Sequence, residues 1–417
     1  MDFREEYRMG LRQDADYIIK KAMEAALPDE AVKKALSDRD FGGKVRLVAI
    51  GKAGWQMAKA ASDLLGDKID SGVVITKYGH VLGGIPRCEC IEAGHPVPDE
   101  NSFRGADAAL KLVQGLSADD TVIFLISGGG SALFEKPIIT KAELEDLTSQ
   151  MLACGADIVE MNTIRKRVSA VKGGKFAQAC APAKVFGVVL SDILGDPLDM
   201  IASGPASPDS TTCADARRVV EKYGLKLTPA MEECLSVETP KSLDNVTMAI
   251  TGSVRQLCAA AEKAAAELGY RPVYLTDRLD CVAREAGTFL GDIAKSMQGS
   301  EESLAYICGG ETVVHLTGKG KGGRNQELAL SAASAISDCR DTAVFSVGSD
   351  GTDGPTDAAG GFVDETTKAA LGEKGIDIFD VLQQNDAYNA LKACGGLIIT
   401  GPTGTNVNDL SVLLVKR

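Results

Sequence analysis

The stretch TVIFLISGGGSAL at residues 121–133 joins six apolar residues directly to a run of serine and glycine. The apolar residues predict a buried strand, and the glycines predict a turn where backbone N–H groups can approach a ligand. Five other apolar runs end in loops of Gly, Ser, Thr, Asp and Lys, at 45–54, 185–196, 246–253, 304–312 and 342–354. Because open α/β sheets bind ligands outside the carboxyl ends of their strands, these six loops predict an enzyme site.

Strand and helix patterns alternate from end to end, which is typical of an α/β protein with parallel sheets. The expected strands are 45–50, 72–76, 121–126, 185–190, 246–250, 304–308, 312–316, 342–347 and 411–415. The expected helices include 53–65, 102–114, 141–155, 254–268, 282–297 and 325–336. A chain of 417 residues exceeds the roughly 250–300 residues at which one core stops growing, so we expect two domains. We place their boundary near the end of the proline-containing stretch 204–245, which gives domains of 1–240 and 241–417.

The composition excludes several classes of protein. The hydrophobic fraction is 45% and the charged fraction 25%, and no apolar run approaches the roughly 18 residues of a membrane span. With 45 Lys and Arg against 58 Asp and Glu, the net charge is −13, which disfavours binding to nucleic acid. We therefore expect no membrane and no nucleic-acid partner. An anionic small ligand needs a local cluster of cations.

The cysteines and the start of the chain favour a cytoplasmic protein. Eleven cysteines are scattered through an acidic chain, which fits reduced thiols better than a disulfide framework. The first 27 residues lack the apolar core of a signal peptide and are too acidic for a transit peptide, so they predict an amphipathic helix. His80, Cys88, Cys90 and His95 include the ligand types that zinc favours. We favour a non-metal interpretation, because C-x-C lacks the usual ligand spacing.

The run Ser127-Gly128-Gly129-Gly130-Ser131 is a strong candidate for ligand contact. Three successive residues without a Cβ let the backbone form a concave nest of N–H donors that suits a phosphate or carboxylate group. A flexible turn is the alternative interpretation. The preceding strand and the two flanking hydroxyl groups favour ligand contact.

Lys52 lies between a predicted strand and a predicted helix. A cation is unfavourable at the positive N-terminal end of a helix, which indicates an anionic ligand. An exposed lysine that extends into water is an equally good explanation.

A glycine-rich loop at 317–327 contains Lys319, Lys321 and Arg324. Three of its glycines match the dinucleotide fingerprint G-x-G-x-x-G literally, namely Gly318, Gly320 and Gly323. That match fits a dehydrogenase. The cations favour another ligand, because a dinucleotide turn holds its pyrophosphate with backbone amides whereas a triphosphate requires positive charge. We therefore rank a phosphoryl-transfer loop first, with Arg324 as its fixed contact.

Carboxylates follow two other predicted strands, in the loops 191–196 and 348–354. Asp192 and Asp350 are the favoured functional residues, as ligands of a hard cation or as a general base. For four further carboxylates turn chemistry is an equally good explanation, namely Asp196, Asp199, Asp353 and Asp357.

Two further polar stretches are candidates for the same site. In the basic stretch 162–175, Arg165, Ser169 and Lys172 would share one face of a helix. A solvated face is favoured there over a phosphate clamp. The glycine loop at 400–409 is expected to join the site late in the chain.

The sequence lacks the motifs of several familiar enzyme classes. There is no Walker loop, no protein-kinase H-R-D set and no G-x-S-x-G elbow, and three histidines leave few candidates for the base of a serine hydrolase. Phosphoryl transfer by positioning, cations and carboxylates is the chemistry that remains.

Taken together, the motifs resemble the glycerate 2-kinase family, whose C-terminal half is the MOFRL domain and whose members have been labelled hydroxypyruvate reductase. The motifs are GKAG (51–54), HPVPDE (95–100), SGGGSAL (127–133), NTIRKRVSAVKGGK (162–175), LSDILGDPLDMIASGP (190–205), GGRNQE (322–327), SDGTDGPTDAAGG (349–361) and TGPTGTNVNDL (400–410). The resemblance covers nearly the whole chain in order.

The resemblance implies a kinase that uses ATP and Mg²⁺ to phosphorylate the 2-hydroxyl group of D-glycerate. It also implies a Rossmann-like N-terminal domain, a smaller α/β C-terminal domain and an active-site cleft between them. The family positions thought to matter correspond here to Lys52, Asp192, Arg324 and Asp350.

From these residues we expect a division of roles. Lys52 and Arg324 neutralise the transferring phosphoryl group, one of Asp192 and Asp350 binds Mg²⁺, and the other accepts the proton of the substrate hydroxyl. The run 127–131 is expected to hold an anionic group of substrate or nucleotide. The glycine-rich loop is expected to add nucleotide contacts from Gly322, Gly323 and Asn325. A monomer or a homodimer is expected.

Two alternatives stay open. A nicotinamide-dependent hydroxypyruvate reductase is supported by the literal fingerprint and by Asp350 after the next strand. A non-catalytic regulator that only binds a nucleotide is the other.

Overall fold

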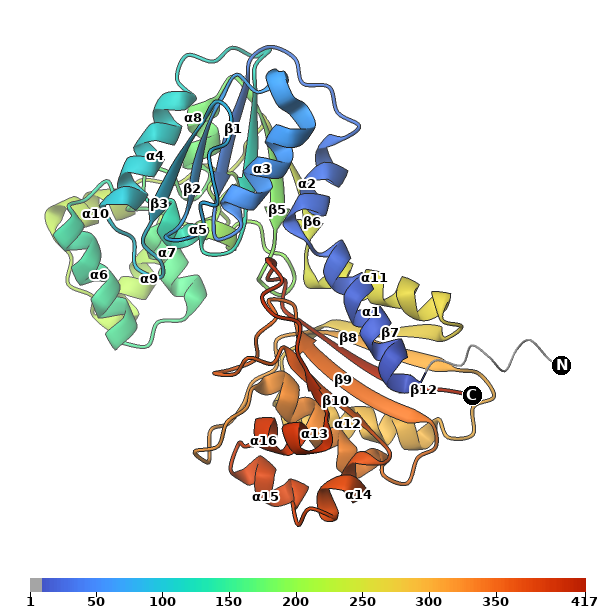
Figure 1. Ribbon diagram of the computed structural model, residues 1–417. Coiled ribbons are helices and arrows are strands. Elements are labelled where there is room, and N and C mark those ends of the chain that lie inside the picture. Colours follow the sequence, from blue (N-terminus) through green and yellow to red (C-terminus); the bar gives the residue numbers. More distant parts are fainter. Residues whose placement is uncertain (1–9) are drawn as a thin grey trace. The chain divides into compact units, whose positions relative to one another are not determined.

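The computed structural model describes residues 10–417, which form two compact units (Figure 1). The first unit is Ala31–Thr251, and the second unit combines residues 10–30 with Gly252–Arg417. Each unit contains a six-stranded sheet and several helices. The predicted α/β class is therefore confirmed.

The sheet of the first unit has the order β3-β2-β1-β4-β5-β6. Its strands are β1 (Val45–Ile50), β2 (Ser71–Lys77), β3 (Cys88–Ala93), β4 (Thr121–Ile126), β5 (Lys184–Leu190) and β6 (Val246–Gly252). β1 pairs in parallel with both β2 and β4, and β2–β3 and β4–β5 are parallel pairs as well. The chain thus adds β2 and β3 on one side of β1 and then β4 on the other. This is the strand order of a doubly wound nucleotide-binding sheet, in which the loops after β1 and β4 border the ligand-binding switch point.

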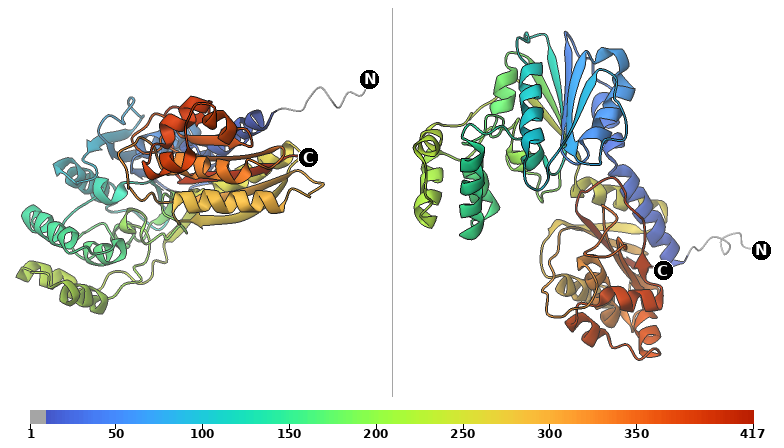
Figure 2. Two further views of the ribbon diagram at one scale, coloured as in Figure 1. Left: turned by 90° about the horizontal axis from the view of Figure 1, so that it is seen from below. Right: turned by 60° about the vertical axis from the view of Figure 1, so that its left-hand side comes forward.

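The central strands of this sheet are apolar because helices cover both faces (Figure 2). All six residues of β4 are buried. Helices α3 (Gly54–Leu65) and α4 (Glu100–Leu112) follow β1 and β3. Phe124 of β4 packs with Phe134 and Phe176, at ring-centroid distances of 4.8–6.0 Å. These rings anchor the segment that follows β4 to the core.

The other helices of this part of the chain are short. They are α2 (Pro28–Leu36), α5 (Gly130–Leu133), α6 (Lys141–Ala153), α7 (Ile158–Arg165), α8 (Lys175–Cys180), α9 (Cys213–Tyr223) and α10 (Pro229–Ser236), with 3-10 turns η1 (Gly66–Lys68) and η2 (Ile201–Ser203). The side chains of Thr140, Asp157, Thr212 and Thr228 cap α6, α7, α9 and α10. These four helices lie beside the sheet (Figure 1) and share a second small core.

The sheet of the second unit is mixed and has the order β11-β10-β9-β12-β8-β7. Its strands are β7 (Arg271–Leu279), β8 (Leu304–Gly310), β9 (Thr342–Gly348), β10 (Gly360–Asp364), β11 (Leu397–Ile398) and β12 (Asp409–Val415). β12 runs antiparallel between β8 and β9, and its first residue, Asp409, lies opposite their last residues, Gly310 and Gly348. The register therefore brings Asp409 to the edge where β8 and β9 end.

Helices pack closely around this second sheet. They are α1 (Leu11–Ala25), α11 (Val254–Glu267), α12 (Ala283–Ser296), α13 (Arg324–Ile336), α14 (Thr367–Gly372), α15 (Ile378–Gln383) and α16 (Ala387–Cys394). A Cβ on Gly287 would overlap Ser331, and one on Gly291 would overlap Ala335. Small residues on α12 thus let it approach α13 closely, and α13 positions the second candidate site.

The division into units differs from the predicted boundary near residue 240 in two places. α1 packs against α11 of the second unit, and its Asp14 accepts hydrogen bonds from Tyr270 (2.6 Å) and Lys416 (2.8 Å). β6 is the sixth strand of the first sheet, so that sheet continues beyond residue 240. Both differences come from contacts between distant parts of the chain, which local sequence patterns do not contain.

The predicted strand at 312–316 is wrong, and four strands were absent from the predicted list. The segment 312–316 makes a single bridge, between Val313 and Val282, and Leu316 is 84% exposed. β-branched residues form a strand only where a neighbouring strand is free to pair. The strands that were missed are β3, β7, β10 and the two-residue β11. They lie toward the sheet edges, where the apolar pattern is short or is interrupted by polar residues.

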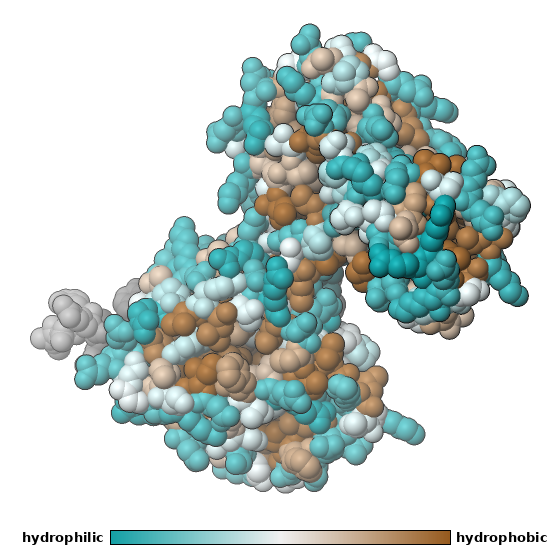
Figure 3. Space-filling view, turned by 180° about the vertical axis from the view of Figure 1, so that it is seen from behind, coloured by the Kyte–Doolittle hydropathy of each residue, from teal (hydrophilic) through white to brown (hydrophobic). Residues whose placement is uncertain are grey.

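No helix within residues 10–417 is long and apolar enough to cross a bilayer. The face shown in Figure 3 mixes polar and apolar residues. Scattered apolar residues are normal on a protein surface and need no ligand to explain them.

Candidate active site

The loops after β1 and β4 are hydrogen-bonded to each other at the switch point of the first sheet. The N–H of Lys52 donates to the carbonyl of Gly128 (2.8 Å), and the hydroxyl of Ser127 donates to the last carbonyl of β1 (3.1 Å). Gly51 has φ 106°, and a Cβ there would overlap oxygens of Ser127, so only glycine fits. The structure thus joins Lys52 and residues 127–131, which we call the glycine loop, into one surface.

Three side chains press against the backbone of the glycine loop. A carboxylate oxygen of Asp192, after β5, occupies the space that a Cβ on Gly128 would need. Gly129 has φ 84°, and a Cβ there would lie 3.2 Å from Cγ of Lys52 and 3.1 Å from Nε2 of His95. The structure therefore places two predicted residues, Lys52 and Asp192, at the loop and adds His95.

Lys52 brings a positive charge to this surface. Within the part of the chain that the structure describes, its ammonium group has no hydrogen-bond or ion-pair partner. Its carbonyl is held by the hydroxyl of Thr76 (3.2 Å) and lies 3.0 Å from His80 Nδ1. A lysine that is fixed at its backbone and unpaired at its tip, in a chain of net charge −13, is suited to an anionic ligand.

Buried polar groups support the end of the glycine loop. Ser131 Oγ lies 3.0 Å from Ser203 Oγ, and the hydroxyl of Ser203 donates to Asn162 Oδ1 (2.8 Å). The ammonium group of Lys172 donates to the carbonyl of Ser131 (2.7 Å). Ala202 and Ser203 have φ 52° and 61°, a conformation that costs about 1–3 kcal/mol per residue and is concentrated at functional sites. Sequence patterns contain no signal for this strained pair.

The basic stretch 162–175 is not a solvated helical face, so that interpretation was wrong. α7 ends at Arg165, and Lys172 is fully buried. Lys175 donates to three backbone carbonyls at 2.6–3.1 Å. Burial lowers the pKa of both Lys172 and Lys175 to about 8. These lysines hold the backbone behind the glycine loop, a role that helical periodicity cannot predict because residues 166–174 form turns.

In the second unit a polar cluster surrounds Arg324, the first residue of α13. Its Nε donates to Asp409 Oδ2 (2.5 Å), its Nη2 donates to Asp409 Oδ1 (3.0 Å), and its Nη1 lies 3.1 Å from a carboxylate oxygen of Glu311. Burial raises the pKa of Asp409, and the hydrogen bonds from Arg324 oppose that rise. Two hydrogen bonds to Asp409 therefore fix the orientation of the guanidinium group of Arg324. Asp409 was not among the residues predicted from the sequence.

Asp353 caps α13 from a buried position. Its carboxylate accepts the N–H groups of Asn325 (3.2 Å) and Gln326 (2.9 Å). Burial raises the pKa of Asp353 to about 6, although these two N–H groups lower it. Asn325, predicted to bind a nucleotide, is buried, and its side chain accepts from Ser346 Oγ (2.5 Å) and donates to Asp353 (3.4 Å). Asn325 thus holds the helix start in place.

Asp350 lies half-exposed in the turn after β9. Its carboxylate accepts the N–H (2.8 Å) and the hydroxyl (3.0 Å) of Thr352. The N–H of Thr403 donates to the carbonyl of Asp350 (3.3 Å). The predicted loop 400–409 therefore shares this surface with Asp350.

The glycine-rich loop 317–327 does not form a dinucleotide turn. β8 ends at Gly310, and no strand lies between it and α13, so the tight strand-turn-helix context of the fingerprint is missing. Gly318 and Gly320 pack on the backbone at Gln384, whose carbonyl accepts the N–H of Gly320 (2.7 Å). Close approach to a neighbouring loop explains these glycines.

The remaining members of this loop also contact protein or solvent. Gly322 packs against residues 385–387, and a Cβ on Gly323 would overlap Asp353. Lys319 is exposed, and Lys321 lies 4.1 Å from the ring centroid of Tyr388. Of the predicted residues in this loop, Arg324 alone combines fixed geometry with partial exposure of its charged group.

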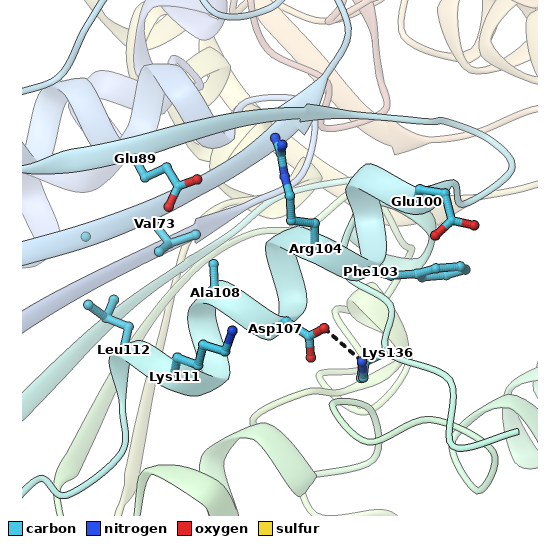
Figure 4. A pocket seen from close by; sticks show the side chains of 11 residues that line it. Val73, Glu89, Glu100, Phe103, Arg104, Asp107, Ala108, Lys111, Leu112 and Lys136 are labelled. Atoms are coloured by element: carbon cyan, nitrogen blue, oxygen red, sulfur yellow. Dashed lines mark hydrogen bonds and ion pairs between the residues drawn. The ribbon is translucent and has the colours of Figure 1, made fainter. Parts of the chain in front are cut away.

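A hollow of about 830 Å³ lies beside α4, at the β2–β3 side of the first sheet (Figure 4). Its charged lining residues are Arg104, Lys111, Lys136, Glu89, Glu100 and Asp107. Three cations and three carboxylates give this hollow no preference for an anion, and none of the predicted site residues lines it. Within residues 10–417 there is no group of three or more His, Cys, Asp and Glu side chains placed to hold a metal ion.

We expect Asp353 to make the protein less stable as the pH rises from about 4 to about 6. The pKa of about 6 in the folded protein lies above the ordinary value of 3.8, so the folded state keeps this proton in a range where the unfolded state has lost it. In Asp353→Asn this contribution disappears, and stability should decline less across that range. Urea unfolding at a series of pH values measures both proteins. Identical pH dependences would assign Asp353 an ordinary pKa.

Two family models match the chain. A model described as a domain of unknown function, DUF4147, matches residues 14–236, and the model of the MOFRL family matches residues 304–409.

The chain is also similar to individual proteins and to a solved structure. It is 52% identical to D-glycerate 2-kinase of Thermotoga maritima, over 97% of this chain and 99% of the relative. It is 39% identical to a putative hydroxypyruvate reductase of Agrobacterium vitis, over 98% of this chain and 95% of the relative. The crystal structure of glycerate kinase from Thermotoga maritima matches with a TM-score of 0.93 at 52% identity, covering 97% of this chain and 99% of that one. With this agreement in sequence, fold and motifs, the chain belongs to the glycerate 2-kinase family.

Proposed function

We propose that this chain transfers the γ-phosphoryl group of ATP to the 2-hydroxyl group of D-glycerate, giving 2-phosphoglycerate and ADP. The observation that carries the proposal is the unpaired ammonium group of Lys52 beside the glycine loop, at the switch point of a doubly wound sheet. The identity of 52% to a D-glycerate 2-kinase supports the same substrate.

Each unit supplies a cation in this scheme. Lys52 attracts the negative oxygens of the phosphoryl group, and its backbone is fixed by the glycine loop. Arg324 presents a planar guanidinium group whose orientation is set by Asp409. Preorganised cations stabilise the charge of a phosphoryl-transfer transition state without reorganising during the reaction. We propose that phosphoryl transfer requires both cations.

The nucleotide supplies the phosphoryl group, and Mg²⁺, when bound, spreads the charge of its phosphates. Mg²⁺ in such sites takes one or two protein carboxylates and completes its shell with phosphate oxygens and water. Asp192, which touches the glycine loop, and Asp350, which is half-exposed after β9, fit that requirement. Asp192 is the better candidate because its carboxylate lies against the loop that is proposed to hold an anion.

We expect Asp192→Asn to raise the Mg²⁺ concentration for half-maximal activity by at least about tenfold. The amide keeps the size of the side chain but lacks the charge that holds the cation. Initial rates across a range of Mg²⁺ concentrations measure this change, and saturating Mg²⁺ should recover part of the rate. Asp350→Asn is the matched variant. An unchanged Mg²⁺ requirement in Asp192→Asn, together with an increased one in Asp350→Asn, would reverse the assignment.

Phosphorus NMR tests the proposed reaction directly. The protein is incubated with ATP, Mg²⁺ and D-glycerate, and the phosphorus signals of the products are compared with those of 2-phosphoglycerate and 3-phosphoglycerate. The 2-phosphate is expected. A 3-phosphate would correct the position of transfer, and the absence of any new phosphate ester would favour a regulator that only binds the nucleotide.

A hydroxypyruvate reductase is the second candidate, because a relative carries that name. The missing dinucleotide turn at 317–327 argues against it. Oxidation of NADH or NADPH in the presence of hydroxypyruvate, followed by absorbance, is the assay. No oxidation is expected.

The reaction is placed in the cytoplasm as part of the proposal. All eleven cysteines are free, which is consistent with a reducing compartment. The predicted monomer or homodimer is tested by sedimentation of the purified protein.

A further inference from the structure

His95 is a half-buried residue to which the scheme above gives no role. It follows β3, and so lies at the carboxyl edge of the same parallel sheet as Lys52 and the glycine loop. Among residues 10–417 its ring has no hydrogen-bond partner and no ion-pair partner. The ring therefore has no structural explanation of its own.

The ring of His95 lies directly on the glycine loop. A Cβ on Gly129 would lie 3.0 Å from Cδ2 and 3.1 Å from Nε2 of the ring, and 3.2 Å from Cγ of Lys52. The Nε2 edge of His95 and the side-chain stem of Lys52 thus both lie close to Gly129. The carboxylate of Asp192 meets the preceding residue, Gly128. Side chains from the ends of β1, β3 and β5 converge on two consecutive glycines.

The surroundings of His95 favour its neutral form. Burial lowers the pKa of His95 below its usual value, and the charges of Lys52, Lys77 and His80 lower it further. The two carboxylates near it along the chain are already engaged. Glu92 accepts the N–H of Val81 (3.0 Å), and Asp99 caps α4 and accepts from Tyr78 Oη (2.7 Å). A neutral imidazole can accept a proton through its unprotonated ring nitrogen.

We propose that His95 is a catalytic residue that accepts the proton of the glycerate 2-hydroxyl group through Nε2. This inference depends on the proposed kinase function. As the hydroxyl oxygen forms its bond to the γ-phosphorus, the bond from that phosphorus to the β,γ-bridging oxygen breaks, and its electron pair leaves with ADP. The hydroxyl proton moves to Nε2 of His95, which later releases it to solvent. Lys52 attracts the phosphoryl oxygens.

This assignment differs from the expectation that an aspartate takes the proton. Asp192, the carboxylate at the glycine loop, is the proposed Mg²⁺ ligand, and a carboxylate that binds a cation is a poor base. Asp350 lies in the other unit, in a turn where its carboxylate already accepts two hydrogen bonds from Thr352. His95 has unoccupied nitrogens beside the cation that attracts the phosphoryl group.

His95→Gln is the central test. Glutamine can hydrogen-bond but cannot take up a proton, so kcat should fall about 100-fold while ATP binding, measured by calorimetry, stays unchanged. The wild-type kcat should decline at acidic pH, and this decline should be absent from His95→Gln. His315→Gln is the control, because His315 is exposed in the second unit; it should keep the wild-type rate and pH profile.

Two outcomes would overturn the proposal. A raised KM with unchanged kcat would make His95 a binding residue, and an acidic decline that persists in His95→Gln would assign the proton to another group. If His95→Gln does not fold, NMR titration of the wild type decides. The chain has three histidines, so the ring signals are few. The pKa measured for the His95 ring must coincide with the pKa at which kcat declines. Failure of the proposed function itself is visible earlier, as the lack of phosphate transfer by the wild type.

Discussion

Lys52→Ala should lower kcat for glycerate phosphorylation about 10³-fold while the protein stays folded. The ammonium group has no partner among the described residues, so its removal leaves no carboxylate stranded. The backbone of Lys52 is held by hydrogen bonds that alanine retains, including the one to the carbonyl of Gly128 (2.8 Å). What is lost is positive charge at the glycine loop.

Lys59→Ala is the matched control for this variant. Lys59 lies on α3, which begins directly after Lys52, and pairs with Asp63 (2.6 Å) at the surface. Loss of an exposed pair changes stability by less than about 1 kcal/mol, and the rate should not change. Steady-state kinetics and thermal unfolding of the two variants separate a lost charge from a general effect of lysine removal. A wild-type rate in Lys52→Ala would remove Lys52 from the scheme.

The interior of both sheets could be predicted from the sequence. β1, β4, β5, β9 and β12 are buried on both faces, so their residues form continuous apolar runs that stand out from the rest of the chain. Three helices were also predicted to within one or two residues, namely α3, α6 and α13. Glycine and serine after the runs marked the carboxyl ends of strands such as β1 and β4.

Elements whose burial depends on distant neighbours could not be predicted. β3 reads Cys-Glu-Cys-Ile-Glu-Ala, because an edge strand exposes part of its length and tolerates charge. The segment 312–316 has the opposite character, with β-branched residues that find no strand to pair with. Residue type reports local preference, whereas pairing is decided by the fold.

In the candidate site, too, some contacts could be predicted from the sequence and others could not. Lys52 and the glycine loop lie next to each other because both follow parallel strands, a relation that strand order makes predictable. The pairing of Arg324 with Asp409, 85 positions apart, depends on the antiparallel register of β12, which no local pattern encodes. The same reason applies to His95, whose role is visible only from the side chains that surround it.

Arg324→Ala should lower kcat at least about 10³-fold, because an arginine that stabilises the transferring phosphoryl group contributes about 10³–10⁵ to the rate. Unlike Lys52→Ala, it should also destabilise the protein. Asp409 is 4% exposed, and both of its oxygens accept hydrogen bonds from Arg324. A buried carboxylate that loses these partners costs about 1–3 kcal/mol. Loss of activity in this variant could therefore reflect either lost chemistry or a distorted site.

The double variant Arg324→Ala/Asp409→Asn separates the two explanations. Removing the charge of Asp409 together with its partner avoids the unpaired buried carboxylate, so urea unfolding should show most of the lost stability restored. The rate should stay as low as in Arg324→Ala, because the guanidinium group is still missing. Asp409→Asn alone should retain more activity than either, since Arg324 keeps its charge but loses part of its fixed orientation. If the double variant regains both stability and rate, then Arg324 serves only to neutralise Asp409, and the phosphoryl group must be stabilised by Lys52 and Mg²⁺ without it.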